Sequence, residues 1–322
     1  MLLLRPASFL LLACAGCNVD ATVGYVESTV VGGIACSDDA LRRCDSGACA
    51  VTSLFEPPAG AITLAADDTD VFYLTNPQSI GKHALAGDGE SALAEADSTL
   101  MRMAADRTHV YWTELDGNVR GVPKSGGARF EASYVFGNPT ELTVDATHLY
   151  WVFPEFGQVA MAPKPSGPAT HISGQASPEA ITTDATHVYW VNSGTGPLTG
   201  ELVRAARGDL TSLEVVLSGL DAPLTIAAAE DAIYFASQTA LFRWVKGASL
   251  AEILATDFSD VKAIAVYGST VYGAGMEGFW RVPVTGGTWQ ELERRPMSGL
   301  TLACSGVYVT GWFESALLRY GP

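Results

Sequence analysis

The sequence has little positive charge and lacks the motifs that mark common catalytic centres. Its 322 residues include 19 Lys and Arg against 35 Asp and Glu, which gives a formal net charge of −16 at pH 7. Such a negative charge repels nucleic acids and anionic lipid headgroups, so neither is an expected partner. The sequence contains no G-x-S-x-G elbow and no H-E-x-x-H motif. We therefore expect no cofactor and no metal ion, and we favour a protein without enzymatic activity.

Long hydrophobic runs are also lacking, except for one at the N-terminus. No later segment has the roughly 20 apolar residues that a transmembrane helix needs. The short basic start that ends at Arg5 and the apolar run Phe9–Ala13 are typical of a leader that directs export. We therefore assign residues 1–16 as a signal peptide.

The end of this leader resembles the lipobox of bacterial lipoproteins, in which small residues precede a cysteine that becomes lipidated. Ala15-Gly16 before Cys17 matches the small pair, whereas Cys14 follows Leu12-Ala13. The resemblance implies lipidation at Cys17, and contact with the membrane through that anchor only. Lipidation at Cys14 and an ordinary secreted protein remain alternatives. Asn18 is not the aspartate associated with inner-membrane retention, so we expect the outer membrane.

Cysteine is rare beyond the leader, and its even number favours disulfides. An exported protein folds in an oxidising space, where the four remaining cysteines can pair in three ways. A zinc site is the alternative, but these four cysteines form no C-x-x-C pair and no histidine lies near them in the sequence. The disulfide candidates are Cys36, Cys44, Cys49 and Cys304. We interpret residues 17–49 as a tether and cysteine-rich segment.

Against these absences stands a repeat that recurs seven times. An aromatic residue behind an aliphatic one returns at intervals of 39, 39, 39, 45, 38 and 36 residues, at Phe72, Tyr111, Tyr150, Tyr189, Tyr234, Tyr272 and Tyr308. Another apolar residue lies eight residues before each of them, at Leu64, Met103, Leu142, Ile181, Ile226, Ile264 and Leu300. A period near forty with short strand-like runs indicates a β-propeller. The sequence therefore predicts an all-β, seven-bladed β-propeller of four-stranded antiparallel blades over residues 50–322.

The two ends of the repeat region predict how the ring closes. The last unit stops at Pro322 without a fourth strand, whereas Ala50–Leu54 stands before the first unit, where other units carry their outer strand. We expect this N-terminal strand to complete the last blade, because such closure removes the sheet edges at the seam. A disulfide from Cys304 to Cys36, Cys44 or Cys49 would then fasten the seam.

Two runs in the repeats resemble known extracellular propellers. Val110-Tyr111-Trp112-Thr113-Glu114 is similar to the YWTD repeat, and Asp-Ala-Thr-His-Val-Tyr-Trp (Asp184 to Trp190) is similar to YWTD/NHL-like repeats of uncharacterised, especially myxobacterial, lipoproteins. The resemblance covers about residues 50–322. It implies a propeller on an exported, lipid-anchored protein and carries no known catalytic residues. YWTD receptors have six blades, whereas this chain has seven units.

Two polar columns repeat with the blades. The histidines lie in equivalent turns of three adjacent blades, at His109, His148 and His187. Blades packed face to face are about 10 Å apart, so these side chains are too far apart to bind one zinc ion. Asp67, Asp106, Asp145 and Asp184 are each followed two residues later by Thr, which favours turn capping. A ring of carboxylates around a calcium ion is the alternative.

The least repetitive segments are the loops between the second and third strands. They combine aromatic residues with carboxylates, which suits a sugar ring or a basic peptide. The candidate ligand-face residues are Glu114, Asp116, Phe153, Glu155, Phe156, Glu277, Trp312 and Glu314. The alternative is that the aromatic rings pack against their own blades.

These observations favour an envelope-anchored, monomeric lipoprotein that acts as a non-enzymatic binding or scaffold module through one loop face. The expected partner is an envelope protein or a glycan. The alternative is a metal-dependent propeller hydrolase or lactonase with its site in the central channel. The inner strands offer mostly Ala, Thr and aliphatic residues, which favours the first interpretation.

Overall fold

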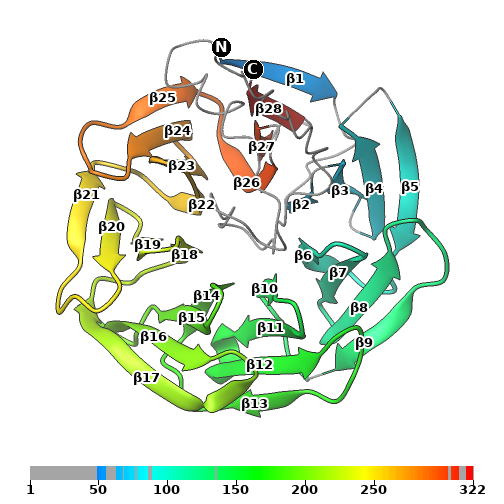
Figure 1. The fold of residues 1–322 in the computed structure, drawn as a ribbon, viewed down its shortest axis with the longest axis horizontal. Coiled ribbons are helices and arrows are strands. Elements are labelled where there is room, and N and C mark those ends of the chain that lie inside the picture. Colours follow the sequence, from blue (N-terminus) through cyan, green and yellow to red (C-terminus); the bar gives the residue numbers. More distant parts are fainter. Residues whose placement is uncertain are drawn as a thin grey trace, which may run out of the picture.

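Seven four-stranded sheets stand around a common axis in this computed structural model (Figure 1). The structure describes residues 49–55, 63–67, 69–76, 78–85, 89–134, 136–303, 306–311 and 317–321. Every blade is an antiparallel sheet whose first strand lies nearest the axis, so the prediction of a seven-bladed β-propeller is confirmed. No helix in these ranges is long and apolar enough to cross a membrane.

The first four blades follow one another along the chain, from innermost to outermost strand. Blade 1 holds β2 (Leu64–Ala66), β3 (Asp70–Asn76), β4 (Ser79–Ala84) and β5 (Glu90–Glu95). Blade 2 holds β6 (Leu100–Ala105), β7 (His109–Glu114), β8 (Asn118–Pro123) and β9 (Phe130–Tyr134). Blade 3 holds β10 (Glu141–Val144), β11 (His148–Phe153), β12 (Gln158–Pro163) and β13 (Thr170–Ile172), with the short helix η1 (Pro154–Phe156) after β11. Blade 4 holds β14 (Pro178–Thr183), β15 (His187–Asn192), β16 (Gly200–Ala206) and β17 (Asp209–Leu220).

The last three blades complete the ring. Blade 5 holds β18 (Thr225–Ala228), β19 (Ala232–Ala236), β20 (Ala240–Val245) and β21 (Glu252–Thr256). Blade 6 holds β22 (Val261–Tyr267), β23 (Thr270–Gly275), β24 (Gly278–Pro283) and β25 (Gln290–Glu293). Blade 7 holds β26 (Met297–Ala303), β27 (Gly306–Gly311), β28 (Leu317–Gly321) and, as its outer strand, β1 (Ala50–Phe55).

The repeated aromatic residues form the contacts between neighbouring blades. Tyr150 on β11 is fully buried and lies in one apolar cluster with Trp190 and Val203 of the next blade. The same arrangement places Tyr189 of blade 4 in a cluster with Trp244 of blade 5. Side chains alternate between the two faces of a strand, so blades 2 to 6 each present a tyrosine to one neighbour and a tryptophan to the other. The aromatic column is therefore the core of the ring.

The predicted N-terminal closure is confirmed. Strand β1 pairs antiparallel with β28 in the register Ala50↔Gly321 and Val51↔Tyr320, and it lies outermost in that blade (Figure 1). Cys49, just before β1, is disulfide-bonded. Cys36, Cys44 and Cys304 lie outside the described residues, so the pairing stays a prediction.

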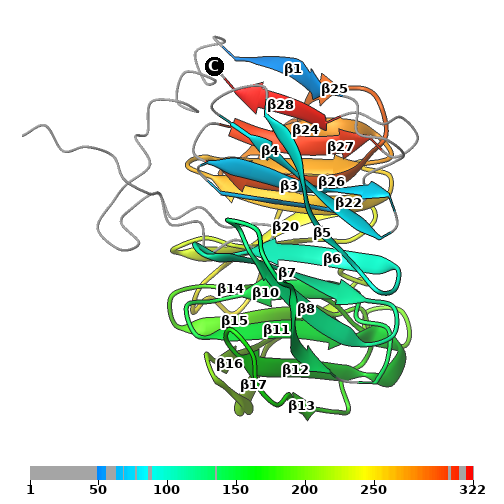
Figure 2. The same cartoon turned by 90° about the vertical axis from the view of Figure 1, so that its right-hand side faces the viewer.

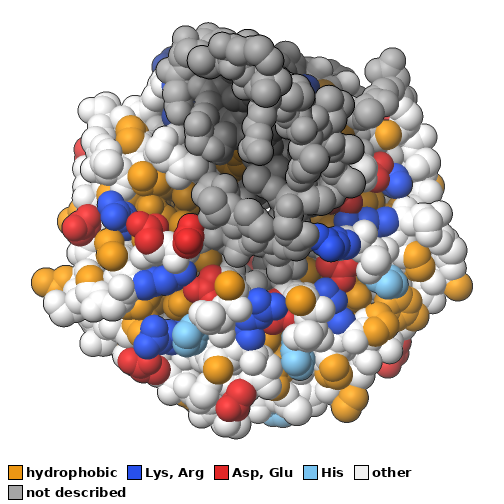
Figure 3. All heavy atoms as spheres, in the orientation of Figure 1, with side chains coloured by type: hydrophobic (Ala, Val, Ile, Leu, Met, Phe, Trp, Pro, Cys, Tyr) orange, Lys and Arg blue, Asp and Glu red, His pale blue; other side chains and the backbone are white. Residues whose placement is uncertain are grey.

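The ring has two faces that differ in the connections they carry (Figure 2). Because the strands are antiparallel, the connections after the first and third strands lie at one end of the blades, and all others lie at the opposite end. We call the first end the turn face and the second the loop face. The turn face is towards the viewer in Figures 1 and 3.

Candidate functional site

Among the predicted ligand-face residues, Glu114 is a structural residue of the interior. Its side chain is fully buried and accepts hydrogen bonds from Trp112 Nε1 (2.9 Å), from the backbone N–H of Asp97 (3.2 Å) and from Arg120 Nε (3.2 Å). A carboxylate with these partners is stabilised inside the protein, because each donor offsets part of the cost of burial. Glu114 is thus not presented to a ligand in this structure.

The loop after β11 separates a buried phenylalanine from an exposed one. Phe153 is fully buried in the cluster between blades 2 and 3, as the packing alternative expected. Phe156 is 40% exposed at the end of η1, and its ring lies 6.1 Å from that of Phe136, which is 74% exposed. Asn138 Nδ2 donates to Glu155 Oε2 at 3.4 Å, which ties the two loops together. This pair of loops therefore presents two aromatic rings beside a carboxylate.

The other predicted loop residues play smaller roles. Asp116 is exposed and accepts hydrogen bonds from the backbone and side chain of Asn118. Glu277 is half-buried in the connection after β23. Trp312 and Glu314 lie outside the described residues.

Exposed large apolar side chains gather on the loop face. Six of them lie in its connections or at the strand end that leads into one: Leu115, Tyr134, Phe136, Phe156, Leu198 and Met276. Among the described residues, one exposed large apolar side chain, Leu250, lies in a turn-face connection. The remaining ones lie on outer strands, at Leu213, Val215 and Ile253. Tyr134 and Phe136 are not among the ligand-face residues predicted from the sequence. They lie where an outer strand leads into the next blade, whereas the prediction covers the loops between the second and third strands.

The loop face also carries the strained backbone. Non-glycine residues with positive φ in the described chain are Ser177, Leu198, Ala222, Asp257 and Asp260, and all five lie in loop-face connections. Such conformations cost about 1–3 kcal/mol each and persist only where the surroundings hold them. The loops of this face therefore have specific shapes.

The turn face is charged, and its charges are paired across blades. Figure 3 shows Lys and Arg side chains beside Asp and Glu side chains over this face. Each carboxylate of the aspartate column meets a cation from the turn after the third strand of the next blade. We call these pairs clasps: Asp67 with Lys124, Asp106 with Lys164 (2.6 Å), Asp145 with Arg207 (2.6 Å) and Asp184 with Lys246 (2.8 Å).

Each clasp also closes its turn, so the turn-capping interpretation is confirmed. Asp184 Oδ1 accepts hydrogen bonds from the backbone N–H groups of Thr186 and His187, both at 2.7 Å. Asp184 Oδ2 accepts a hydrogen bond from the Tyr189 hydroxyl and pairs with the Lys246 ammonium. The cation in turn donates to backbone carbonyls of its own blade, as Lys246 Nζ does to Ala229 O (2.7 Å). One side-chain pair therefore stabilises two turns and the junction between them.

The equivalent junction of blades 5 and 6 is apolar on both sides. Ala229 replaces the aspartate and Val284 replaces the cation, and both pack against the cluster between these blades. The clasp cations escaped sequence analysis because each lies 57 to 62 residues after its aspartate, and only the ring brings them together.

Each histidine of the column contacts a threonine and a tyrosine of its own blade. Thr186 Oγ1 lies 2.7 Å from His187 Nδ1, and the imidazole stands 5.8 Å from the ring of Tyr189 in its own blade. His109 and His148 have the same two neighbours in their blades. No group of three or more His, Cys, Asp or Glu side chains that could hold a metal ion occurs in the described part of the chain.

Comparisons with known proteins agree on the fold. No family model matches the sequence, and no curated protein matches it. The WD40 β-propeller domain of Doa1 has a TM-score of 0.68 at 11% identity, over 84% of this chain and 95% of that chain. BamB from Moraxella catarrhalis has a TM-score of 0.57 at 12% identity, over 81% and 82%. A chain of the Nidogen/Laminin complex has 0.51 at 19%, over 64% and 83%. This protein is a β-propeller repeat protein.

The Asp106–Lys164 clasp is expected to show strong coupling in a double-mutant cycle. Asp106→Asn keeps a capping oxygen but leaves Lys164 without its charge partner, and Lys164→Met leaves the carboxylate unpaired. Each single change should lower the free energy of unfolding by about 3 kcal/mol, and the double variant by less than the sum. Urea unfolding measures all three. The exposed Arg294–Glu291 pair is the control, with coupling below about 1 kcal/mol. Equal coupling in both pairs would show that the clasp does not hold the blades.

Acid should release the clasps. Burial raises the pKa of Asp184, but Lys246 and the two turn amides outweigh it and lower the pKa from 3.8 to about 2. The same balance lowers the pKa of Asp67, Asp106 and Asp145. Because the folded pKa lies below the unfolded one, this stability is complete above pH 3.8 and is lost as the pH falls through about 2.

Asp184→Asn should therefore flatten the acid dependence of stability. We expect the difference in free energy of unfolding between pH 6 and pH 2 to shrink by about 2 kcal/mol, measured from urea midpoints. A variant whose stability still falls as steeply as that of the wild type would place the acid sensitivity elsewhere.

Proposed function

We propose that this protein is an exported binding or scaffold module that holds a partner protein on its loop face. The observation that carries this proposal is the unequal distribution of exposed apolar side chains, which gather on the loop face while the turn face is occupied by clasps. Exposed aromatic residues beside polar groups are typical of protein-binding surfaces. The partner is expected to carry positive charge, because the chain has a net charge of −16 and Glu155 lies beside Phe156.

The proposal includes a lipid anchor at Cys17. Strand β1 is an outer strand, so it starts at the turn face, and residues that precede Cys49 join the propeller there. An anchor at Cys17 would therefore be tethered to the turn face, which leaves the loop face directed away from the membrane. This arrangement is consistent with the resemblance to YWTD/NHL-like lipoproteins of the myxobacterial type, and the proposed location is the outer membrane.

Site-specific photo-crosslinking in the cell that produces the protein tests the loop face. A photoreactive residue at Leu198, 64% exposed on the loop face, should give a discrete adduct with a partner, whereas one at Leu250 on the turn face should not. Phe136→Ser with Phe156→Ser should remove the adduct, because truncation of an interface anchor costs about 2 kcal/mol or more. Melting temperatures verify that the double variant folds. An adduct of equal yield from Leu250, or one that survives the double change, would contradict the proposal.

The anchor is tested by replacing each leader cysteine. Cys17→Ser should prevent incorporation of labelled fatty acid and release the protein from the membrane fraction, because the modified thiol is absent. Cys14→Ser is the matched control and should leave both unchanged. If Cys14→Ser alone releases the protein, the lipidation site is Cys14, and if neither does, the protein is held by something other than a lipid at these positions.

A further inference from the structure

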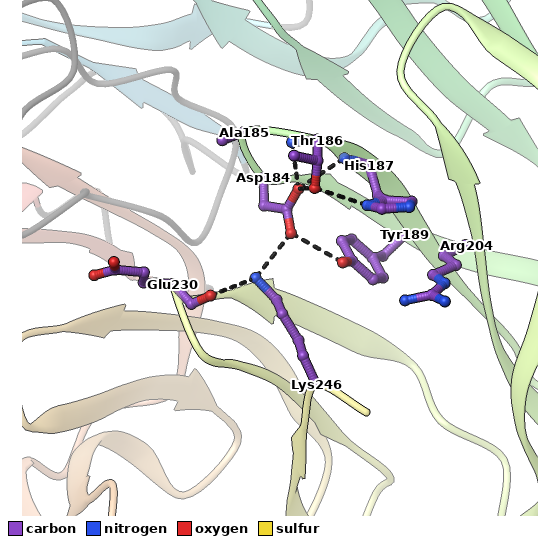
Figure 4. Close-up of a pocket in the computed structure, with 8 residues that line it drawn as sticks. All are labelled: Asp184, Ala185, Thr186, His187, Tyr189, Arg204, Glu230 and Lys246. Carbon is purple, nitrogen blue, oxygen red and sulfur yellow. Dashed lines mark hydrogen bonds and ion pairs between the residues drawn. The ribbon is translucent and has the colours of Figure 1, made fainter. Parts of the chain in front are cut away.

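Blade 4 contains a hollow at a place that is filled in blades 2 and 3. It lies on the turn face beside the Asp184–Lys246 clasp and has a volume of about 250 Å³ (Figure 4). His187, Tyr189 and Arg204 line it on the blade 4 side, and Lys246 lines it on the blade 5 side. Blades 2, 3 and 4 share the same histidine and tyrosine, so the difference between them needs its own explanation.

In blade 2 a phenylalanine fills the same place. Phe130 from the outer strand stands edge-on to His109 at 5.5 Å and to Tyr111 at 6.4 Å. The residue paired with Tyr111 is Gly121, where an added Cβ would lie 2.6 Å from the Phe130 ring. A glycine opposite the tyrosine therefore makes room for the phenylalanine.

In blade 3 the turn of the next blade fills it. Gly208 donates its backbone N–H to Tyr150 Oη at 2.8 Å, and a Cβ at Gly208 would lie 3.1 Å from the His148 ring. The preceding residue, Arg207, forms the clasp with Asp145. The turn thus lies directly on the tyrosine and the histidine.

Blade 4 has neither filling. The residue paired with Tyr189 is Arg204, and Gly247, which follows the clasp lysine as Gly208 follows Arg207, has nothing within 4 Å of its Cβ position. The hollow consequently remains open between an arginine, a histidine and the lysine stem.

The polar groups of the hollow are not equally available. Lys246 Nζ already donates to Asp184, Ala229 O and Glu230 O, which accounts for its three N–H groups. Arg204 donates from Nε and Nη2 to Glu214 Oε2, on a side chain that is 58% exposed, and it also hydrogen-bonds the Tyr189 side chain. The guanidinium has five N–H groups, so these partners leave donors for a ligand.

His187 offers the complementary function. Thr186 Oγ1 donates its single hydrogen to Asp184 Oδ1 at 3.0 Å, so at His187 it accepts from Nδ1–H. In the neutral imidazole this assigns Nε2 as an acceptor. The hollow therefore combines a planar cationic donor with a neutral nitrogen that accepts from a hydroxyl group.

We propose that this hollow binds a small hydroxylated carboxylate of the sugar-acid class. The carboxylate pairs with the N–H groups of Arg204 that Glu214 and Tyr189 leave over, since guanidinium and carboxylate are complementary in charge and shape. A hydroxyl group of the same ligand donates to His187 Nε2, and the ring lies along the Lys246 stem. The volume of about 250 Å³ is below the usual range for drug-sized ligands, which limits the occupant to one sugar ring.

Titration of the full-length protein with D-glucuronate tests the proposal by ligand-observed NMR or calorimetry. We expect saturable binding of one equivalent, weaker binding of D-glucose, which lacks the carboxylate, and weaker binding of inorganic phosphate, which lacks the ring. Arg204→Gln should weaken glucuronate binding about ten- to a hundredfold, because a charge-assisted hydrogen bond is lost. Arg204→Lys should also weaken it, since lysine keeps the charge but not the planar fork.

The matched control is Arg243→Gln. Arg243 is paired with Tyr234 in blade 5 as Arg204 is with Tyr189 in blade 4, and it donates to Val284 O across the next junction. This variant should bind glucuronate as the wild type does, and circular dichroism verifies that all variants fold. Any one of three results overturns the proposal: no saturable glucuronate binding, equal binding of glucose or phosphate, or equal affinity in Arg204→Gln and the wild type.

Discussion

The whole structure depends on the burial of two apolar faces by every blade. A single four-stranded sheet with aromatic residues on both faces would be unstable in water. Both faces are buried only when a neighbouring blade packs on each side. The requirement passes from blade to blade until the ring closes, so blade 7 needs an outer strand although the chain has ended. Strand β1 meets this need by pairing with β28. The position of β1 beside β28 follows from this packing.

Charge and apolar packing are alternatives at the junctions on the turn face. Four junctions use a buried or half-buried Asp with Lys or Arg, whereas Ala229 with Val284 serves the fifth. A buried ion pair contributes little net stability relative to an apolar pair of similar volume, but removal of one partner is costly. The two kinds of junction are therefore exchangeable as pairs and not as single residues, which is consistent with the joint replacement of both members by Ala229 and Val284.

The fold could be predicted from the sequence because the period of the apolar residues reports the packing of each strand directly. The site could be predicted only in part. Glu114 and Phe153 are residue types that often bind ligands, but both are buried here. Glu114 is held inside by Trp112 and Arg120, and Phe153 packs in the cluster shared with the neighbouring blade. Conversely, Phe136 lies 20 residues from Phe156 in the sequence, and only the approach of two loops makes them one surface. Sequence patterns identify what repeats, whereas function here depends on contacts between repeats.

In a repeat protein, a residue that differs from its equivalents in the other blades can indicate a function, because the shared contacts already stabilise the fold. The clasp, the capped turn and the histidine–tyrosine contact recur in blades 2 to 4. A cation opposite the second-strand aromatic residue is itself part of the plan: Lys82, Arg204, Arg243, Arg281 and Arg319 hold this position, and only blades 2 and 3 replace it, with Gly121 and Met161. What differs is the partner of the cation: Lys82 and Arg243 donate to a backbone carbonyl of the next blade, whereas Arg204 donates to Glu214 of its own blade. The partner of Arg204, and not the presence of a cation, is therefore the departure on which the proposed ligand depends.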